Sequence, residues 1–229
     1  MKKLYKVEHY GRDKQGWLKQ RGYGGSSVSA LFGKNKYKNV LDIYCSAVAP
    51  KDEIEDKQTA NTIYGQKAEK PVAELWSLNH PKYKLIYPKT ITMYRRIDKP
   101  YMTYTADALL EEIATGRKGI YEGKTRVVQS KAEPDEWRAG ILPEQYVLQV
   151  LQGFAVKNDT DFIVLCVELK FIDYDTGEYA SSEIRSYVLE RKDCLEAIQK
   201  VEDKQTEFEE NHIIPRIPPN LEIEIKLGE

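Results

Sequence analysis

Residues 162–172 constrain the fold more than any other stretch of this chain, because they read Phe-Ile-Val-Leu-Cys-Val-Glu-Leu-Lys-Phe-Ile. A short apolar run rich in β-branched residues predicts a strand buried on both faces. Residues 173–177 predict a turn after it, and residues 183–189 predict the partner strand. No apolar run reaches the roughly 18 residues that a membrane span needs, so we expect no membrane partner.

Helical and strand patterns alternate along the rest of the chain. The expected helices cover residues 59–76, 142–156 and 192–211, and the expected strands cover residues 83–87, 91–95, 101–105 and 119–128. We expect the strands between residues 83 and 107 to pair with one another. The last helix is expected to face the core with Cys194, Leu195, Ile198, Val201 and Phe208. Without a linker or repeat, the sequence predicts one α/β domain over residues 1–229, with a mixed sheet flanked by helices.

The cysteines and the N-terminus narrow the cellular setting. Cys45, Cys166 and Cys194 are odd in number and widely spaced, which supports neither a disulfide framework nor structural zinc. The lysines at the start have no apolar segment behind them, so we expect no export signal and a cytoplasmic location. No Ser-His or Cys-His spacing supports covalent catalysis.

Charge is unevenly distributed, although the net charge of the chain is only −1. Residues 1–38 carry ten basic and two acidic side chains, a local charge of +8, whereas residues 200–229 carry four basic and eight acidic ones, a charge of −4. Such asymmetry is typical of a phosphate-facing surface, and equally of a solvated lysine-rich face.

Within the basic segment, residues 22–27 form a Gly-rich turn, Gly-Tyr-Gly-Gly-Ser-Ser, directly after Arg21. Ser26 or Ser27 can cap a helix that begins near Val28. A glycine turn that leads into a helix can bind an anion through backbone N–H groups. The alternative interpretation is an ordinary turn and cap.

Asp107, followed by Glu122-Gly123-Lys124, has the layout of a metal-dependent hydrolytic site. On a strand, Glu122 and Lys124 point to the same face. If Asp107 lies on a neighbouring strand, two carboxylates can share Mg²⁺ or Mn²⁺, with the lysine beside an attacking water. Because charged residues make up 31% of the chain, the same spacing also arises by chance in a solvated hairpin.

Two predicted helices carry further polar candidates. Glu69 lies close to Pro71, where we expect a kink or the start of a second helix. Gln145, Gln149 and Gln152 form a polar stripe on one helix face, which hints at contact with a polar partner, although a plain solvent-facing surface is the more common case.

The order of these motifs resembles the YqaJ-type viral recombinase, or lambda-exonuclease-like, family of the PD-(D/E)xK nuclease superfamily. The blocks that carry the resemblance are Trp17 with Arg21 and residues 22–27; Gly65, Glu69 and Pro71; Asp107, Glu122 and Lys124; and Pro143, Tyr146 and Gln149. Four departures occur: Ala108 replaces a glycine, Ser27 replaces an aspartate, the second glutamine is displaced to Gln152, and the stretch after Arg21 is short. None of them removes a metal ligand.

The resemblance implies a PD-(D/E)xK restriction-endonuclease-like fold and a role for each matched residue. Asp107, Glu122 and the carbonyl of Gly123 would bind Mg²⁺, with Mn²⁺ as a substitute, and Glu69 would assist a second metal through water. Lys124 would orient and deprotonate the attacking water, and Gln149 would hold the nucleophile or the scissile phosphate. A 5′-phosphate would be gripped by Arg21, Gly25, Ser26 and Ser27. Asp98 and Tyr146 are further candidates from the same comparison.

The implied activity is 5′-to-3′ digestion of double-stranded DNA ends, leaving 3′ overhangs for a single-strand annealing protein. The family also implies a homo-oligomer, a trimeric ring threaded by DNA. A structure-specific endonuclease or nickase of the same superfamily is the alternative enzyme. A non-catalytic DNA-end-binding recombination partner is the alternative of another class.

Overall fold

The apolar run at residues 162–172 forms an inner strand of a five-stranded sheet in the computed structural model, which describes residues 2–49, 59–173 and 175–220. The strand order is β2-β5-β6-β7-β8. The strands are β2 (Tyr83–Ile86), β5 (Ala108–Glu112), β6 (Lys118–Val127), β7 (Phe162–Ile172) and β8 (Tyr179–Glu190). Only β6 and β7 pair in parallel, so the sheet is mixed, as expected.

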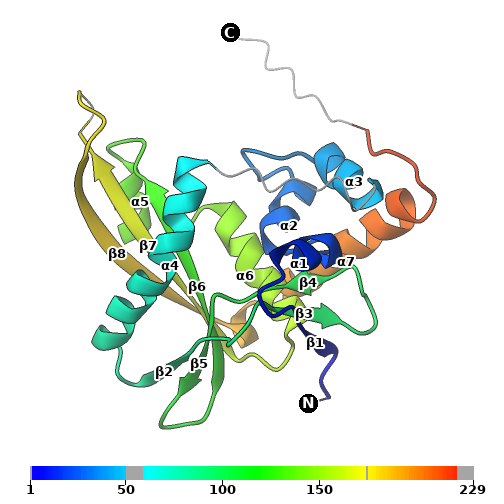
Figure 1. Ribbon diagram of the computed structural model, residues 1–229, viewed down its shortest axis with the longest axis horizontal. Helices are drawn as coiled ribbons and strands as arrows, with labels where there is room; N and C mark the ends of the chain where they lie inside the picture. The colour runs from blue at the N-terminus through cyan, green and yellow to red at the C-terminus, as the bar shows by residue number, and fades with distance from the viewer. Residues whose placement is uncertain (1, 50–58, 174, 221–229) are drawn as a thin grey trace.

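The parallel pair requires a crossover, which two helices provide: α5 (Glu133–Arg138) and α6 (Glu144–Val156). Val150 and Phe154 of α6 pack with Ile120, Ile163 and Leu165 on one face of the sheet. Helix α4 (Ala60–Asn79) covers the opposite face (Figure 1), where its core residues Ala73 and Trp76 join Tyr121, Val164 and Cys166. Both faces of β7 are therefore covered, which explains its apolar sequence.

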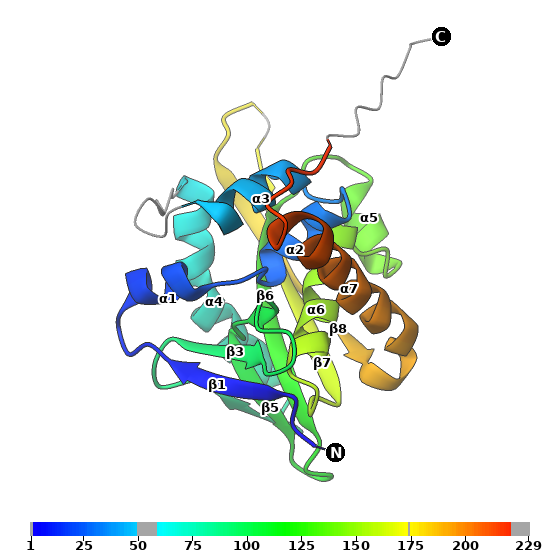
Figure 2. The same cartoon turned by 90° about the vertical axis from the view of Figure 1, so that its right-hand side faces the viewer.

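A second, three-stranded sheet has the order β1-β3-β4. Its strands are β1 (Tyr5–His9), β3 (Thr92–Arg96) and β4 (Thr103–Tyr104), with β1 and β3 side by side in Figure 2. The expected strands 83–87, 91–95 and 101–105 are present, but they do not all pair with one another. Strand β2 pairs with β5 in the larger sheet, because the chain passes to the other sheet between β2 and β3. Strand β5 itself was not predicted.

The expected helix at residues 59–76 is confirmed as α4, with the Thr59 hydroxyl accepting from the backbone N–H of Thr62 at its start. It runs through Pro71 to Asn79, so no second helix begins at the proline. The remaining helices near the N-terminus are α1 (Lys14–Gln20), α2 (Gly25–Leu31) and α3 (Val40–Val48).

The last expected helix is divided into three parts: the 3₁₀ turn η2 (Arg191–Asp193), helix α7 (Leu195–Phe208) and the π-helical turn η3 (Glu209–Ile213). Ile198, Val201 and Phe208 face the core as expected, but Leu195 is 59% exposed because it lies at the first position of α7, before the buried stripe begins. Residues 221–229 of the acidic segment lie outside the described residues. Among the described helices, none has both the length and the apolar content to cross a membrane.

Candidate active site

Strand β6 presents Glu122 and Lys124 on one face, as the two-residue period of a strand requires. The Lys124 ammonium donates to Oε1 of Glu122 over 2.6 Å, and the Glu122 side chain is only 1% exposed. Burial lowers the pKa of Lys124, but the nearby charges of Glu122 and Asp107 outweigh it and raise that pKa above its ordinary value. The lysine is therefore held as a cation.

Two further side chains donate to the same carboxylate. The Tyr104 hydroxyl of β4 donates to Oε2 of Glu122, and the Gln149 amide of α6 donates to Oε1. Tyr104 is 1% exposed and was missed by sequence reasoning. The alternation of Met102, Tyr104 and Ala106 indicates that Tyr104 faces the core. This pattern could have identified it, because a buried tyrosine needs a hydrogen-bond partner for its hydroxyl.

Asp107 directly precedes β5, the strand that neighbours β6. The register pairs Ala108 with Tyr121, which brings Asp107 alongside the Glu122–Gly123 segment. The backbone N–H of Gly123 donates to Oδ2 of Asp107 over 2.7 Å. Burial and the charge of Glu122 raise the pKa of Asp107 well above its ordinary range, against the opposing effects of Lys124 and the Gly123 N–H. The predicted pairing of acids on neighbouring strands is thus present in the structure.

Glu69 reaches this site from α4. Gly65, one turn earlier, lies where α4 crosses β6, and a Cβ there would sit 3.3 Å from the Thr125 hydroxyl. Glu69 is exposed as a whole residue, although protein atoms crowd its carboxylate. This desolvation and the charge of Glu122 raise the pKa of Glu69, while Lys124 lowers it. We call Glu69, Asp107, Glu122 and Lys124 the acid cluster.

The donor chemistry of the acid cluster fits a hard divalent cation. Among the described residues, no three His, Cys, Asp or Glu side chains converge closely enough to hold a metal by themselves. Mg²⁺ does not need such a cage, because it is usually bound by one or two carboxylates and keeps several waters. Asp107 and Glu122 supply two carboxylates whose mutual repulsion a cation would relieve. The carbonyl of Gly123, and a water that Glu69 would hold, are the further donors that the family resemblance implies.

A small cavity of about 50 Å³ adjoins the cluster. Its lining residues are Arg21, Gly24, Gly25, Ser26, Thr103, Tyr104, Thr105 and Gln149. The volume exceeds the 10–15 Å³ or so that one water needs. Tyr104 and Gln149 therefore belong both to this cavity and to the hydrogen bonds on Glu122.

Trp17 explains how Arg21 is positioned. The Arg21 guanidinium stacks 4.7 Å from the centre of the Trp17 ring, and the Trp17 indole N–H donates to the Thr105 hydroxyl over 3.2 Å. A flat, preorganised guanidinium beside glycine backbone suits recognition of a phosphate. We call this space the phosphate cavity.

The glycine turn differs from its expected form. Helix α2 begins at Gly25 with Gly24 at its N-cap, so Ser26 and Ser27 lie in the first turn instead of capping a helix near Val28. Close packing explains the glycine at the first position of α2, because a Cβ on Gly25 would lie 2.8 Å from Cγ of Gln149. Ser26 lines the phosphate cavity, whereas Ser27 is absent from its lining.

Other candidate residues lie in different surroundings. Asp98 forms an ion pair with Arg96 at 2.7 Å, and its described contacts do not include the acid cluster. Tyr146 lines a separate cavity beyond Lys124, together with Gln145. Gln152 is fully buried and donates to the backbone carbonyls of Tyr23 and Thr103, so its polarity serves packing between elements.

Comparison with known proteins agrees with this geometry. The structure resembles that of an alkaline exonuclease, LHK-Exo, from Laribacter hongkongensis, with a TM-score of 0.57 and 13% identity over 87% of this chain and 93% of the other. A structure of LHK-Exo in complex with dAMP gives a TM-score of 0.53 and 14% identity over 86% and 91% of the two chains. These likenesses confirm the expected PD-(D/E)xK fold class. No curated protein matches the sequence. A family model described as the YqaJ-like viral recombinase domain matches residues 16–162, and the chain belongs to that family.

Proposed function

We propose that this protein is a Mg²⁺-dependent exonuclease that digests double-stranded DNA from its 5′ ends and leaves 3′ overhangs for recombination by strand annealing. The observation that carries the proposal is the shared wall between the phosphate cavity and the acid cluster. Tyr104 and Gln149 line the cavity and also donate to Glu122. A terminal phosphate bound at Arg21 would therefore place the first phosphodiester bond of that strand beside the cluster. An endonuclease has no use for such an end pocket.

Each residue of the site would have its own role in hydrolysis of the phosphodiester bond. Asp107, Glu122 and the Gly123 carbonyl would hold Mg²⁺, which supplies charge stabilisation and a more acidic bound water. Lys124 would orient the attacking water and stabilise the charge that develops on the phosphate. We do not assign it the deprotonation step, because Glu122 and Asp107 raise its pKa. Gln149 would exchange its bond to Glu122 for one to the nucleophile or the scissile phosphate.

The assembly is part of the same proposal. By family resemblance, we propose a homo-oligomer, a trimeric ring, and a single-strand annealing protein as its partner. Sizing of the purified protein by light scattering tests the ring, and a monomer at working concentration would refute it.

End-labelled DNA tests the activity directly. A linear duplex labelled at one 5′ or one 3′ end, incubated with Mg²⁺, should lose the 5′ label as mononucleotide while the 3′-labelled strand shortens progressively. EDTA should stop both reactions. Cutting of covalently closed circular DNA would instead indicate an endonuclease or nickase, and binding without metal-dependent loss of duplex would indicate a non-catalytic partner.

The phosphate cavity makes a second prediction. Wild-type protein should prefer a 5′-phosphorylated end to a 5′-hydroxyl end, and Arg21→Ala should erase the preference by slowing only the phosphorylated substrate. Arg12→Ala, which removes an exposed arginine from the same basic segment, is the matched control and should keep it. Wild-type indifference to the 5′-phosphate would refute this role for Arg21.

A further inference from the structure

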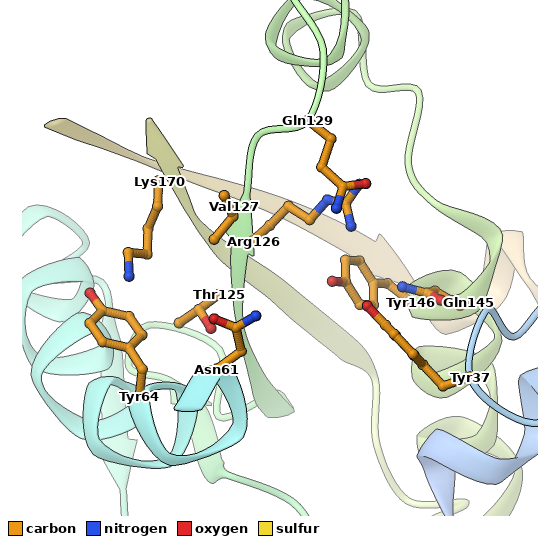
Figure 3. Close-up of a pocket in the computed structure, with 10 residues that line it drawn as sticks. All are labelled: Tyr37, Asn61, Tyr64, Thr125, Arg126, Val127, Gln129, Gln145, Tyr146 and Lys170. Carbon is orange, nitrogen blue, oxygen red and sulfur yellow. The ribbon is translucent and has the colours of Figure 1, made fainter. Parts of the chain in front are cut away.

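The three glutamines of helix α6 lie in three different surroundings. Gln145 lines a separate cavity together with Tyr146 (Figure 3). Gln149 lines the phosphate cavity and donates to Glu122. Gln152 lines neither space, because its side chain is fully buried. A buried amide needs hydrogen-bond partners, so the groups that bind Gln152 show what its side chain holds in place.

The first partner of Gln152 is a second fully buried glutamine, Gln205 of α7. The Gln152 amide donates to Oε1 of Gln205 over 3.2 Å, and the Gln205 amide donates to Oε1 of Gln152 over 2.6 Å. The Gln205 amide also donates to the carbonyl of Val201, one turn earlier on α7. Each glutamine therefore fixes the direction in which the other's amide points. We call Gln152 and Gln205 the amide pair.

The Gln152 amide nitrogen also joins two segments that enclose the phosphate cavity. It donates to the carbonyl of Tyr23 in the glycine turn and to the carbonyl of Thr103 in β4, both over 3.1 Å. Thr103 lines the cavity, and Tyr23 directly precedes two of the lining glycines. If the amide were reversed, its oxygen would face two carbonyl oxygens, which have no proton to donate. The donor on Gln205 helps to hold the Gln152 amide in the orientation that joins the two segments.

Helix α7 supports the same two segments at further points, and it packs against α6 and α2 (Figure 2). The Tyr101 hydroxyl donates to the Thr206 hydroxyl over 3.0 Å. The Tyr23 hydroxyl donates to Glu209, directly after α7, over 2.5 Å. The Tyr101 carbonyl in turn accepts from the backbone N–H of Tyr23 over 2.9 Å. The glycine turn and the segment that leads into β4 are thus bound to each other and to α7.

The walls of the phosphate cavity have little room to move. The volume of the cavity is only about 50 Å³. A Cβ on Gly22 would lie 2.0 Å from the carbonyl oxygen of Tyr101, so the backbone of the turn is already in close contact with its neighbour. A small displacement of either wall changes the distances from Arg21 and the glycine N–H groups to a bound phosphate. Hydrogen bonds tolerate only a narrow range of distances and angles, so the spacing of the walls decides how well a phosphate fits.

We propose that Gln205 is a positioning residue for recognition of the 5′-phosphate at a DNA end. It acts through Gln152, whose amide sets the spacing between the glycine turn and β4, and it touches no substrate itself. Arg21 would supply the charge that attracts the phosphate, and the amide pair would keep the cavity walls at the spacing that the phosphate needs. This inference rests on the proposed function, because it takes the phosphate cavity as the site of the 5′ end. It extends the site to α7, which follows residues 16–162 of the family match.

Single-turnover digestion of two linear duplexes, one with a 5′-phosphate and one with a 5′-hydroxyl, tests the proposal. Gln205→Met keeps a side chain of similar length but removes the amide, so Oε1 of Gln152 loses its donor. The rate on the phosphorylated duplex should fall roughly ten-fold, the scale of one buried hydrogen bond whose loss leaves an acceptor unpaired. The rate on the hydroxyl duplex should change little, so the ratio of the two rates should fall.

A double-mutant cycle shows whether Gln205 acts through Gln152. Gln152→Met alone should reduce the same ratio of rates. Adding Gln205→Met should reduce it no further, because the group through which Gln205 reaches the cavity is already gone. Additive losses would mean that Gln205 affects the cavity by another route, and would overturn the proposal.

Two substitutions on α7 separate positioning from a general loosening of the helix. Gln199→Met removes an exposed glutamine that donates to Asp203 over 2.8 Å, and it should behave as wild type. Val201→Ala shortens a buried side chain but keeps the carbonyl to which Gln205 donates. It should lower Tm and leave the ratio of the two rates unchanged.

An unchanged ratio in folded Gln205→Met, or an equal loss of rate on both duplexes, would overturn the proposal and leave the exonuclease assignment standing. So would a fall of the ratio in Val201→Ala as large as that in Gln205→Met. Thr206→Val removes the hydroxyl partner of Tyr101 and should lower the ratio by a smaller amount, and it provides the same test if Gln205→Met does not fold. Wild-type protein that digests both duplexes at the same rate would refute the role of the phosphate cavity and this inference with it. Absence of any digestion by wild type would instead refute the proposed function itself.

Discussion

Two charged clusters in this protein use the same residue types but balance them differently. Around Arg96, which has a side chain only 4% exposed, two acids and two bases meet: Asp98 at 2.7 Å, Glu202 at 2.8 Å, and Lys99, which lies 3.4 Å from Glu202. In the acid cluster, three acids share one lysine.

The pKa shifts follow that balance. Hydrogen bonds from Arg96 lower the pKa of Asp98, whereas burial and the charge of Glu122 raise the pKa of Asp107. In the Arg96 network the acidic and basic charges balance, and such a network stabilises the fold. In the acid cluster the acids outnumber the bases, so a bound cation could supply the missing positive charge. This comparison supports our proposal that the acid cluster is functional and that the Arg96 network is structural.

The largest expected effect separates the two clusters by activity. Asp107→Asn or Glu122→Gln should abolish Mg²⁺-dependent cleavage of linear duplex while DNA binding in Ca²⁺ persists, because each variant removes a metal-binding charge. Asp98→Asn, the matched change in the Arg96 network, should cleave at nearly the wild-type rate. If Asp98→Asn also abolished cleavage in a folded protein, the division between the clusters would be wrong.

Substitutions in the Arg96 network should lower the stability of the protein more than they lower its activity. Arg96→Ala removes a buried guanidinium, leaves Glu202 with only the longer contact to Lys99 at 3.4 Å, and takes a hydrogen bond from the carbonyl of Ala155. We expect a loss of about 3 kcal/mol in the free energy of unfolding, at the lower end for a broken buried pair because Asp98 is half exposed. Denaturant unfolding measures this change. Cleavage per folded molecule should be unchanged, and an unaltered stability would show that the network is dispensable.

The two lysines offer a smaller contrast. Lys124→Ala should lower the cleavage rate by roughly 10²–10³, the usual cost of losing one preorganised electrostatic group. Lys99→Ala removes a lysine from the Arg96 network and should change the rate little. Single-turnover kinetics with saturating enzyme compares them. A Lys124→Ala protein that cleaves normally, or that unfolds, would remove the catalytic role of Lys124.

Much of the fold followed from sequence because its signals were local. The apolar run of β7 and the stripe of α6 each fix an element within about a dozen residues. Pairing depends on distant segments, which explains why β2 was expected beside β3 although it lies beside β5. The predicted burial of Leu195 was wrong for a similar reason, because its burial depends on where α7 meets its neighbours.

The candidate site shows the same limit, because contacts between distant segments could not be predicted from local sequence patterns. Asp107, Glu122 and Lys124 could be predicted, since strand alternation alone aligns the last two. Tyr104 was missed because its hydroxyl finds Glu122 only after two sheets come together. The role of Trp17 is equally non-local, since its ring must lie against Thr105 before Arg21 can stack on it.

Thermal unfolding with and without Mg²⁺ tests the central claim, that the acid cluster is a cation site because its charge is uncompensated. The raised pKa of Asp107 means that ionising it costs stability as pH rises, so in EDTA at pH 8 Asp107→Asn should be more stable than wild type. Mg²⁺ at a hundredfold excess over its Kd should add about 2.7 kcal/mol to wild type, roughly 5–10 °C in Tm. The account predicts this rise for wild type and for Asp98→Asn but not for Asp107→Asn; equal rises in all three proteins, or none in wild type, would contradict it.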